Sequence, residues 1–185
     1  MKTSSVAILL LVPFAGAHQP SANEGITEIE DATISYAVYG DFPTGSELRE
    51  IHLTLPTPYA LPFELLVPHI TRNEDFRPMY AVVGPGLPAP TAEELDLLPK
   101  ELPEGWGVFL DQNDKEPRDV IFEGFMRRVS WSTGTIAIPL REGDHQIWIW
   151  SPEQTPGEFV MGFGVEEDFS EGFGGVFANW GTYAY

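Results

Sequence analysis

The sequence lacks cysteine, since none of its 185 residues is a cysteine. The chain therefore cannot form a disulfide, and packing alone must hold its fold. It also has no thiol for nucleophilic catalysis and no thiolate for a metal site. For an exported protein, the same absence favours a bacterial periplasm or cell exterior over a eukaryotic secretory route.

Basic residues are also scarce. Lysine and arginine together number 10 against 28 acidic residues, which gives a formal charge of −18. A negative field of this size repels nucleic acid and anionic lipid, so we exclude both as partners. The acids are dispersed along the chain, which is typical of a solubilising surface. Attraction of a cation or of a basic partner is the functional alternative.

Long apolar runs are missing except near the N-terminus. There, Lys2 precedes an apolar stretch from Val6 to Phe14, and small residues follow at Ala15 to Ala17. These three parts predict a secretory signal peptide over residues 1–17, with a run too short to span a bilayer. We expect a mature single domain over residues 18–185, exported to the periplasm or outside the cell, without a membrane span. A retained N-terminal anchor is the alternative.

The clearest strand pattern lies near the C-terminus. Ile147 and Ile149 alternate with Trp148 and Trp150, which is the period of two that a strand requires. A proline and a turn follow, and apolar residues alternate again up to Gly164. We predict a β-hairpin over residues 143–164, and we expect both faces of its first strand to be covered.

The rest of the chain reads as short strands separated by turns, with 18 glycines and 17 prolines. Thr91 and Glu94 form a capping box, which predicts one short helix inserted over an edge or an open end. We predict an all-β antiparallel β-sandwich of the jelly-roll or Greek-key kind, entered through a loose polar segment at 18–31. The predicted strands are Ala32–Tyr39, Leu48–Leu55 with Ile51, Leu53 and Leu55 inward, Phe63–Pro68, Met79–Val83, Pro103–Leu110, Val120–Phe125, Arg128–Trp131 and Thr135–Leu140.

Two resemblances follow from short motifs. The segments Asp144 to Pro152 and Gly157 to Gly164 resemble the final hairpin of bacterial pre-peptidase C-terminal-type sandwiches. The mature chain also resembles uncharacterised exported bacterial proteins that open Ala-His-Gln-Pro-Arg, although Ser21 replaces the arginine. Both resemblances imply export and a sandwich fold, and neither implies a reaction. The second one rests on Ala17–Pro20, Val38–Gly40, Leu66–Pro68, Phe122–Phe125 and Glu166–Phe169.

One candidate metal site depends on the new N-terminus. Cleavage after Ala17 would leave His18 first, offering its amine and its imidazole to one metal ion. A second imidazole from His52, His69 or His145 would complete a copper-binding brace, because copper prefers nitrogen ligands. In this respect His18 is similar to the N-terminal histidine of copper-dependent polysaccharide monooxygenases. The alternative is that the signal-peptidase site alone places this histidine.

The tryptophans offer a second candidate site. Indole faces pack on sugar rings, so we consider Trp131, Trp148 and Trp150 as a ligand-binding platform, with one of Trp148 and Trp150 exposed. Core packing is the competing interpretation.

Catalytic motifs are missing. The sequence has no Gly-x-Ser-x-Gly elbow, no His-Glu-x-x-His and no phosphate loop. The acidic turn that starts at Asp111 lacks the glycine and glutamate of a calcium-binding EF-hand loop. We therefore expect a non-enzymatic exported sandwich that binds a ligand, a protein or a glycan. A copper-binding protein and a carbohydrate-binding module are the two alternatives. The main prediction needs no cofactor, and the first alternative needs copper.

Overall fold

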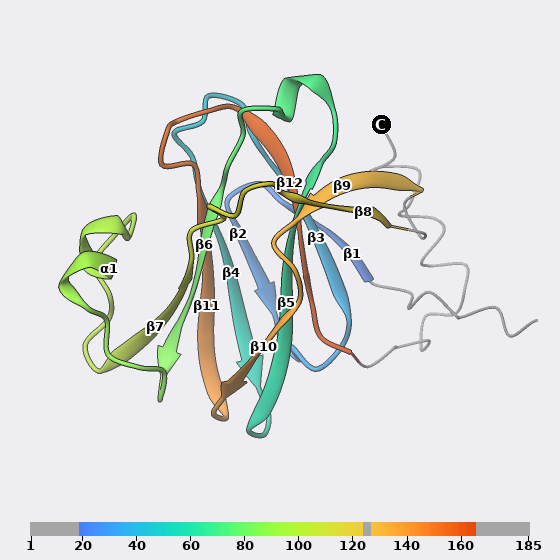
Figure 1. Cartoon of the computed structure of the whole chain (residues 1–185). Coiled ribbons are helices and arrows are strands. Elements are labelled where there is room, and N and C mark those ends of the chain that lie inside the picture. The colour runs from blue at the N-terminus through green and yellow to red at the C-terminus, as the bar shows by residue number, and fades with distance from the viewer. Residues whose placement is uncertain (1–18, 124–126, 166–185) are drawn as a thin grey trace, which may run out of the picture.

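The computed structural model describes residues 19–123 and 127–165, and these residues form two β-sheets packed face to face (Figure 1). Two short helical segments accompany the sheets, a 3₁₀ turn at Thr71–Asn73 and the helix α1 at Ala92–Leu97. The first sheet contains β1 (Gln19–Asn23), β3 (Tyr36–Phe42), β5 (Tyr59–Pro68), β8 (Asp119–Glu123), β9 (Arg128–Ser132), β10 (Ile136–Leu140) and β12 (Gly157–Phe163). The second sheet contains β2 (Ile26–Ile29), β4 (Leu48–Leu55), β6 (Met79–Pro85), β7 (Trp106–Asp111) and β11 (Gly143–Trp150).

The predicted all-β sandwich with one short helix is confirmed, but its sheets are mixed. The first sheet runs β1-β3-β12-β5-β9-β8, with β10 beside β5, and the second runs β2-β4-β11-β6-β7. The prediction of a loose segment at 18–31 is wrong, because β1 pairs with β3 and β2 pairs with β4. Both of these pairs are parallel, so the sandwich is not wholly antiparallel.

The predicted hairpin over residues 143–164 is also wrong in its pairing. Both of its strands exist, but β11 lies in the second sheet between β4 and β6, whereas β12 lies in the first sheet between β3 and β5. The connection after Trp150 therefore crosses from one sheet to the other. Residue alternation identifies a strand, and it carries no information about which strand becomes the neighbour.

The main core fills the space between the sheets. The predicted inner set of Ile51, Leu53 and Leu55 is confirmed, since all three side chains are buried. They face Phe63 and Met161 of the first sheet within one continuous cluster. The inward residues alternate with outward ones along each strand, as burial of one sheet face requires.

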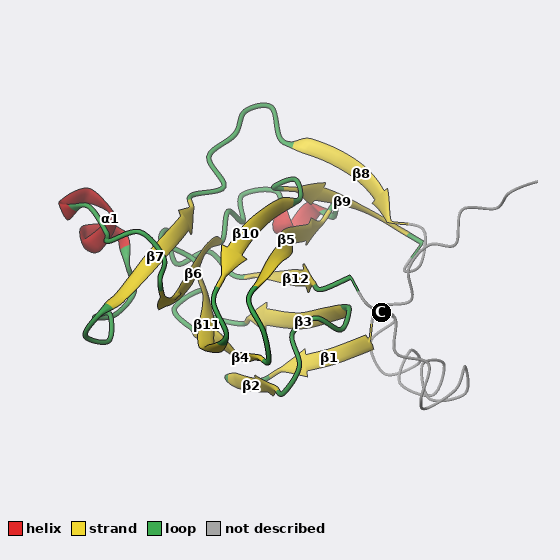
Figure 2. Cartoon of the chain, turned by 90° about the horizontal axis from the view of Figure 1, so that it is seen from below, coloured by secondary structure: helices red, strands yellow, loops and turns green. Residues whose placement is uncertain are grey.

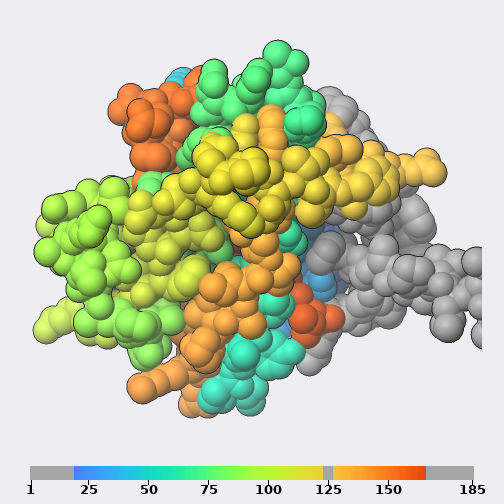
Figure 3. Space-filling model, viewed as in Figure 1, coloured from blue at the N-terminus to red at the C-terminus, as the bar shows by residue number. Residues whose placement is uncertain are grey.

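A second apolar cluster covers the outer face of the second sheet. Trp148 and Trp150 of β11 belong to it, and segment 86–105 covers them with Leu97, Leu98 and neighbouring residues. The helix α1 in that segment keeps the predicted capping box at Thr91. The helix lies beside β7, the edge strand of the second sheet, as the prediction of an edge position expects (Figure 1, Figure 2 and Figure 3). Its Leu97 packs against the cluster on the outer face. No helix among residues 19–123 and 127–165 is long and apolar enough to cross a bilayer.

Strand β3 ends later than predicted. The strand continues through Gly40 and Asp41 to Phe42, although glycine and aspartate are more typical of turns. The reason is close packing, because a Cβ atom on Gly40 would lie only 2.4 Å from the ring of Phe159. Glycine thus serves here to admit an aromatic ring, as glycines within strands often do.

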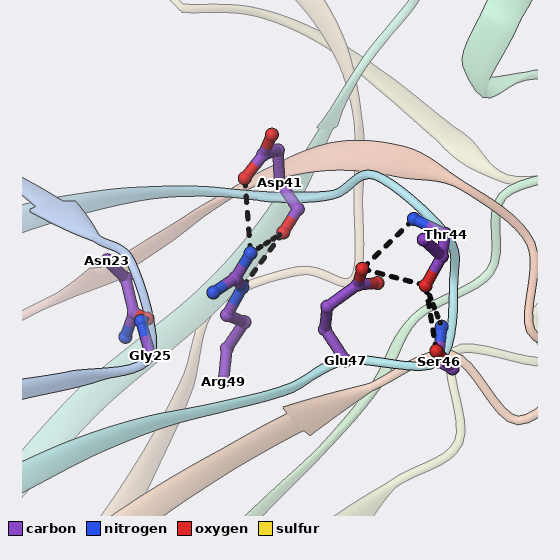
Figure 4. Close-up of polar contacts among 7 residues, drawn as sticks. All are labelled: Asn23, Gly25, Asp41, Thr44, Ser46, Glu47 and Arg49. Atoms are coloured by element: carbon purple, nitrogen blue, oxygen red, sulfur yellow. Dashed lines mark hydrogen bonds and ion pairs between the residues drawn. The ribbon is translucent and has the colours of Figure 1, made fainter.

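A buried arginine links the two sheets at one end (Figure 4). Arg49 is on β4, and its Nε and Nη2 atoms donate to the backbone carbonyl of Asp41 on β3 at 2.8 and 2.7 Å. The same Nη2 lies 3.2 Å from the Asp41 carboxylate, and the guanidinium stands 5.9 Å from the ring centre of Phe42. These contacts satisfy a charge that burial would otherwise penalise.

Candidate functional site

The histidines proposed as metal ligands stand on separate elements. His18 lies outside the described residues, so the copper brace stays a prediction. His52 is on the outer face of the second sheet, with Nδ1 2.9 Å from Glu28 and Nε2 3.1 Å from Glu50. Burial raises the pKa of Glu50, but Lys100 at 2.8 Å and His52 outweigh that effect, so the net pKa is lowered. Both ring nitrogens of His52 are thus already paired with carboxylates.

The other two described histidines are engaged elsewhere. His145 is fully buried on β11, where Nδ1 lies 3.2 Å from the Gly143 carbonyl oxygen. Burial lowers the pKa of His145, against smaller opposing contributions from carbonyl groups of Gly143 and Pro85. His69 follows β5 and meets the Trp131 ring edge-on at 4.3 Å. Among the described residues, no three metal-ligating side chains gather into a site.

The tryptophans proposed as a sugar platform are mostly covered. Trp148 and Trp150 lie on the same side of β11, because residues two apart on a strand share a face. Both are buried, so the expectation that one of them is exposed is wrong. The indole Nε1 of Trp148 donates to Gln146 at 2.8 Å, and the Lys100 ammonium lies 4.6 Å from its ring centre.

Trp131 differs from the other two because it is only half buried. It packs against the main core from β9, and the guanidinium of Arg118 lies 3.5 Å from its ring centre. One face of the indole is therefore taken by a cation–π contact. The ligand-binding prediction for this platform stays a prediction, now carried by Trp131 alone.

One feature that could hold a ligand is an apolar hollow on the outer face of the first sheet. Its volume is about 300 Å³, which is at the lower end for small-molecule pockets. Most of its lining is apolar, and the residues come from strands that are far apart in the sequence. They include Ala37 and Tyr39 of β3, Leu66 of β5, Ile121 of β8, Ser130 of β9, Val160 and Gly162 of β12, and Val165.

A second hollow of about 370 Å³ adjoins the first and shares Tyr39, Pro68, Arg128 and Val160 with it. We call the two together the outer-face groove. The first hollow is its apolar half, and the second, which contains Glu24, Asp41 and Glu158, is its acidic half.

Arg128 stands where the two halves meet. Within the described parts of the chain, its guanidinium has neither an ion pair nor a hydrogen bond. The acidic groups around it are largely engaged, because Asp41 pairs with Arg49 and Glu158 pairs with Arg72. Arg128 is therefore the available cation of the outer-face groove.

Glu64 lies in the apolar half, and its carboxylate serves the protein itself. Oε1 accepts a hydrogen bond from the Ser132 hydroxyl, and Oε2 lies 3.4 Å from the Thr135 hydroxyl. These contacts connect β5 to β9 and to the start of β10. The hollow has free space at Gly162, which also lines it. A Cβ atom on Gly162 would have only the Glu64 carbonyl oxygen near it, at 3.7 Å.

Sequence reasoning missed the outer-face groove. A signal was present in the pairs Leu65-Leu66 and Val160-Met161, where consecutive apolar residues place hydrophobic side chains on both faces of a strand. Such pairs predict that the outer face of the first sheet is apolar. They cannot indicate that five strands assemble around a single hollow.

Comparison with known proteins assigns this chain to no family. No family model matches the chain, and no curated protein matches it. The structure is similar to the crystal structure of the pre-peptidase C-terminal domain of a collagenase from Bacillus anthracis, with a TM-score of 0.42 and 9% sequence identity. The match covers 76% of this chain and 95% of that domain.

Proposed function

We propose that this protein is a non-catalytic exported domain that binds a small amphiphilic ligand in the outer-face groove. The apolar part of the ligand would lie in the apolar half, and its anionic group would pair with Arg128. Export is supported by the signal-peptide pattern of residues 1–17. The observation that carries the proposal is the apolar half of the groove, with Arg128 at the end that meets the acidic half.

The nature of the lining favours an amphiphile over a peptide or a sugar. The groove lies over the face of a sheet, and its central strands β3, β12 and β5 are paired on both sides, so their backbone groups are already used. A peptide or a glycan would leave many polar groups without partners on such a surface, which is costly. An alkyl chain or an aromatic ring has no such requirement.

The test uses decanoate as the probe and isothermal titration calorimetry as the readout. We expect decanoate to bind, and we expect Arg128→Gln to weaken it about tenfold, because a charge-assisted hydrogen bond is lost. Arg127→Gln is the matched control, since Arg127 is the exposed neighbour. Decanol, which has the same chain without the charge, should bind both variants equally.

A second variant tests the location. Gly162→Leu should fill the apolar half without strain and weaken both decanoate and decanol, whereas Ala60→Leu, on an exposed position of β5, should change neither. Absence of heat for every probe would refute the proposed function. If Gly162→Leu left the affinity for both probes unchanged, the ligand would bind elsewhere on the molecule.

A further inference from the structure

The last described residues lie at the outer-face groove. Gly164 and Val165 follow β12 and line the apolar half, and Val165 is 51% exposed. The amide of Val165 donates to the carbonyl oxygen of Thr33 at 3.0 Å, which holds this point of the backbone against the first sheet. Figure 2 shows β12 in the middle of that sheet, between β3 and β5. Residues 166–185 lie outside the described residues, and the chain leads into them from the rim of the groove.

The sequence that follows combines acidic and apolar side chains. Residues 166–171 read Glu-Glu-Asp-Phe-Ser-Glu, without a basic residue. Gly172 and two further glycines come next, and glycine disfavours a helix, so we expect an extended segment. In such a segment Phe169 and Glu171 share one side, because alternate residues face the same way. An aromatic ring beside a carboxylate has the chemical character of the amphiphile proposed for the groove.

We propose that residues 166–171 fold back over the outer-face groove and compete with its ligand. Phe169 would occupy the apolar half, and Glu171 would pair with Arg128. Glu166–Asp168 would form the chain reversal at the rim, where water solvates their carboxylates. The docking of this segment stands by itself, whereas its regulatory consequence rests on the proposed function.

The chain is long enough for this arrangement. Val160 and Arg128 both line the boundary between the two halves. Val160 and Val165 are five residues apart, so their Cα atoms are separated by about 18 Å at most. Glu171 is six residues beyond Val165 and can reach about 20 Å when extended. Glu171 can therefore return to the level of Arg128, and Phe169 then lies over the apolar half on the way.

The charges of the groove are compatible with this pairing. Within the described residues, Arg128 has no ion pair, so a carboxylate from the segment would be its partner. Asp41 and Glu158 of the acidic half already pair with other arginines. Glu24 follows β1, and three strands separate β1 from β9, which holds Arg128. At about 4.8 Å per strand, Glu24 is too far away to oppose the contact between Glu171 and Arg128 directly.

Tethering removes the cost that disfavours a free peptide in this groove. Only side chains of the segment enter the hollow, while its backbone stays at the rim and keeps its hydrogen bonds to water. The short connection to Val165 gives an effective concentration in about the millimolar range, so a weak contact is sufficient. The apparent affinity for an external ligand is then lowered by the fraction of molecules whose groove is open.

Limited chymotrypsin digestion of the full chain, followed by mass spectrometry, tests the docking without any ligand. Chymotrypsin cleaves after aromatic residues, and its rate at a docked site follows the population of the open form. We expect Gly162→Leu, which fills the apolar half, to speed cleavage after Phe169 about fivefold and to leave cleavage after Tyr183 unchanged. The control Ala60→Leu should alter neither rate. Equal rates after Phe169 in wild type and Gly162→Leu would overturn the inference.

A double-mutant cycle tests the proposed ion pair with the same digestion. Arg128→Gln and Glu171→Gln should each speed cleavage after Phe169 about threefold, as loss of a partly exposed ion pair predicts. The double variant should be no faster than either single variant, because both substitutions break one contact. Glu166→Gln is the matched control and should have no effect. Fully additive effects of the two substitutions would refute this pairing.

Decanoate titration separates this inference from the proposed function. Phe169→Ser should raise the affinity for decanoate about threefold, because the groove is open in more molecules. Tyr185→Ser, which changes an aromatic residue outside the docked segment, should leave that affinity unchanged. Equal decanoate affinity in wild type and Phe169→Ser would refute the competition and leave the proposed function intact. Faster digestion of Gly162→Leu without decanoate binding to any variant would support the docking and refute the proposed function.

Discussion

A charged residue that is buried between the two sheets destabilises the fold unless neighbouring groups hydrogen-bond to it. Arg49 is the clearest case, because it is a buried cation whose partners are a carbonyl and a carboxylate on the opposite sheet. Removing such a group leaves those acceptors without donors. The sequence identified Leu48–Leu55 as a strand, but it gave no reason to expect an arginine on its inner face.

Arg49→Met should lower the free energy of unfolding by about 2–3 kcal/mol, because hydrogen bonds to a charged group are lost while packing volume is kept. Urea denaturation of the mature protein measures this change. Arg72→Met is the control, because its ion pair with Glu158 is exposed and should contribute no more than about 1 kcal/mol. Equal effects for both variants would contradict the role assigned to Arg49.

His145 predicts how stability depends on pH. Burial lowers its pKa in the folded state, so between the unfolded value of about 6.5 and the lower folded value the unfolded chain binds a proton that the folded chain does not. Stability should therefore fall as pH decreases through that window, by at most about 1.4 kcal/mol per pH unit from this group. Urea titrations at several pH values measure the slope, and His145→Gln should reduce it. A slope that His145→Gln leaves unchanged would contradict this role of His145.

At the scale of elements, tight contacts between connections fix how the sheets meet. Gly45 lies in the turn between β3 and β4, and its φ is +83°. A Cβ atom there would lie 2.0 Å from the carbonyl oxygen of Gln154, in the connection between β11 and β12. This close approach holds the two crossings between the sheets against each other.

Gly45→Ala should destabilise the fold by about 2 kcal/mol or more, since it combines a left-handed φ with a clash against backbone. Gly25→Ala should change stability by less than about 1 kcal/mol, because nothing lies within 4 Å of its added Cβ. Thermal unfolding of the two variants gives the comparison. A Gly45→Ala protein as stable as Gly25→Ala would show that this contact can relax freely.

The elements also show why sequence reasoning succeeded only in part. Strand β4 was predicted with its exact bounds, because its alternation of buried and exposed residues is a local property. The partner of β11 was predicted wrongly, because the alternation of Ile147 and Trp148 indicates only that both faces of the strand are covered. One face is covered by the opposite sheet and the other by segment 86–105, and no local pattern identifies which.

At the scale of the whole molecule, composition predicted the class of fold. Scattered glycine and proline, a lack of cysteine and one capping box led to a sandwich with a short helix. The outer-face groove was beyond reach because it depends on five strands that are brought together only by the strand order. The sequence around Arg128 does not distinguish it from the other arginines. That it has no ion pair among the described residues becomes visible only when Asp41 and Glu158 are seen to pair with Arg49 and Arg72.

The strand order has a consequence for how the protein is made. Strands β11 and β12 are the last strands of the described residues to be synthesised, yet each lies between earlier strands in the middle of its sheet. A nascent chain that ends before residue 143 holds the margins of both sheets without the strands that join them. Neither layer can close before residues 143–163 have left the ribosome, so shorter nascent chains should remain unfolded.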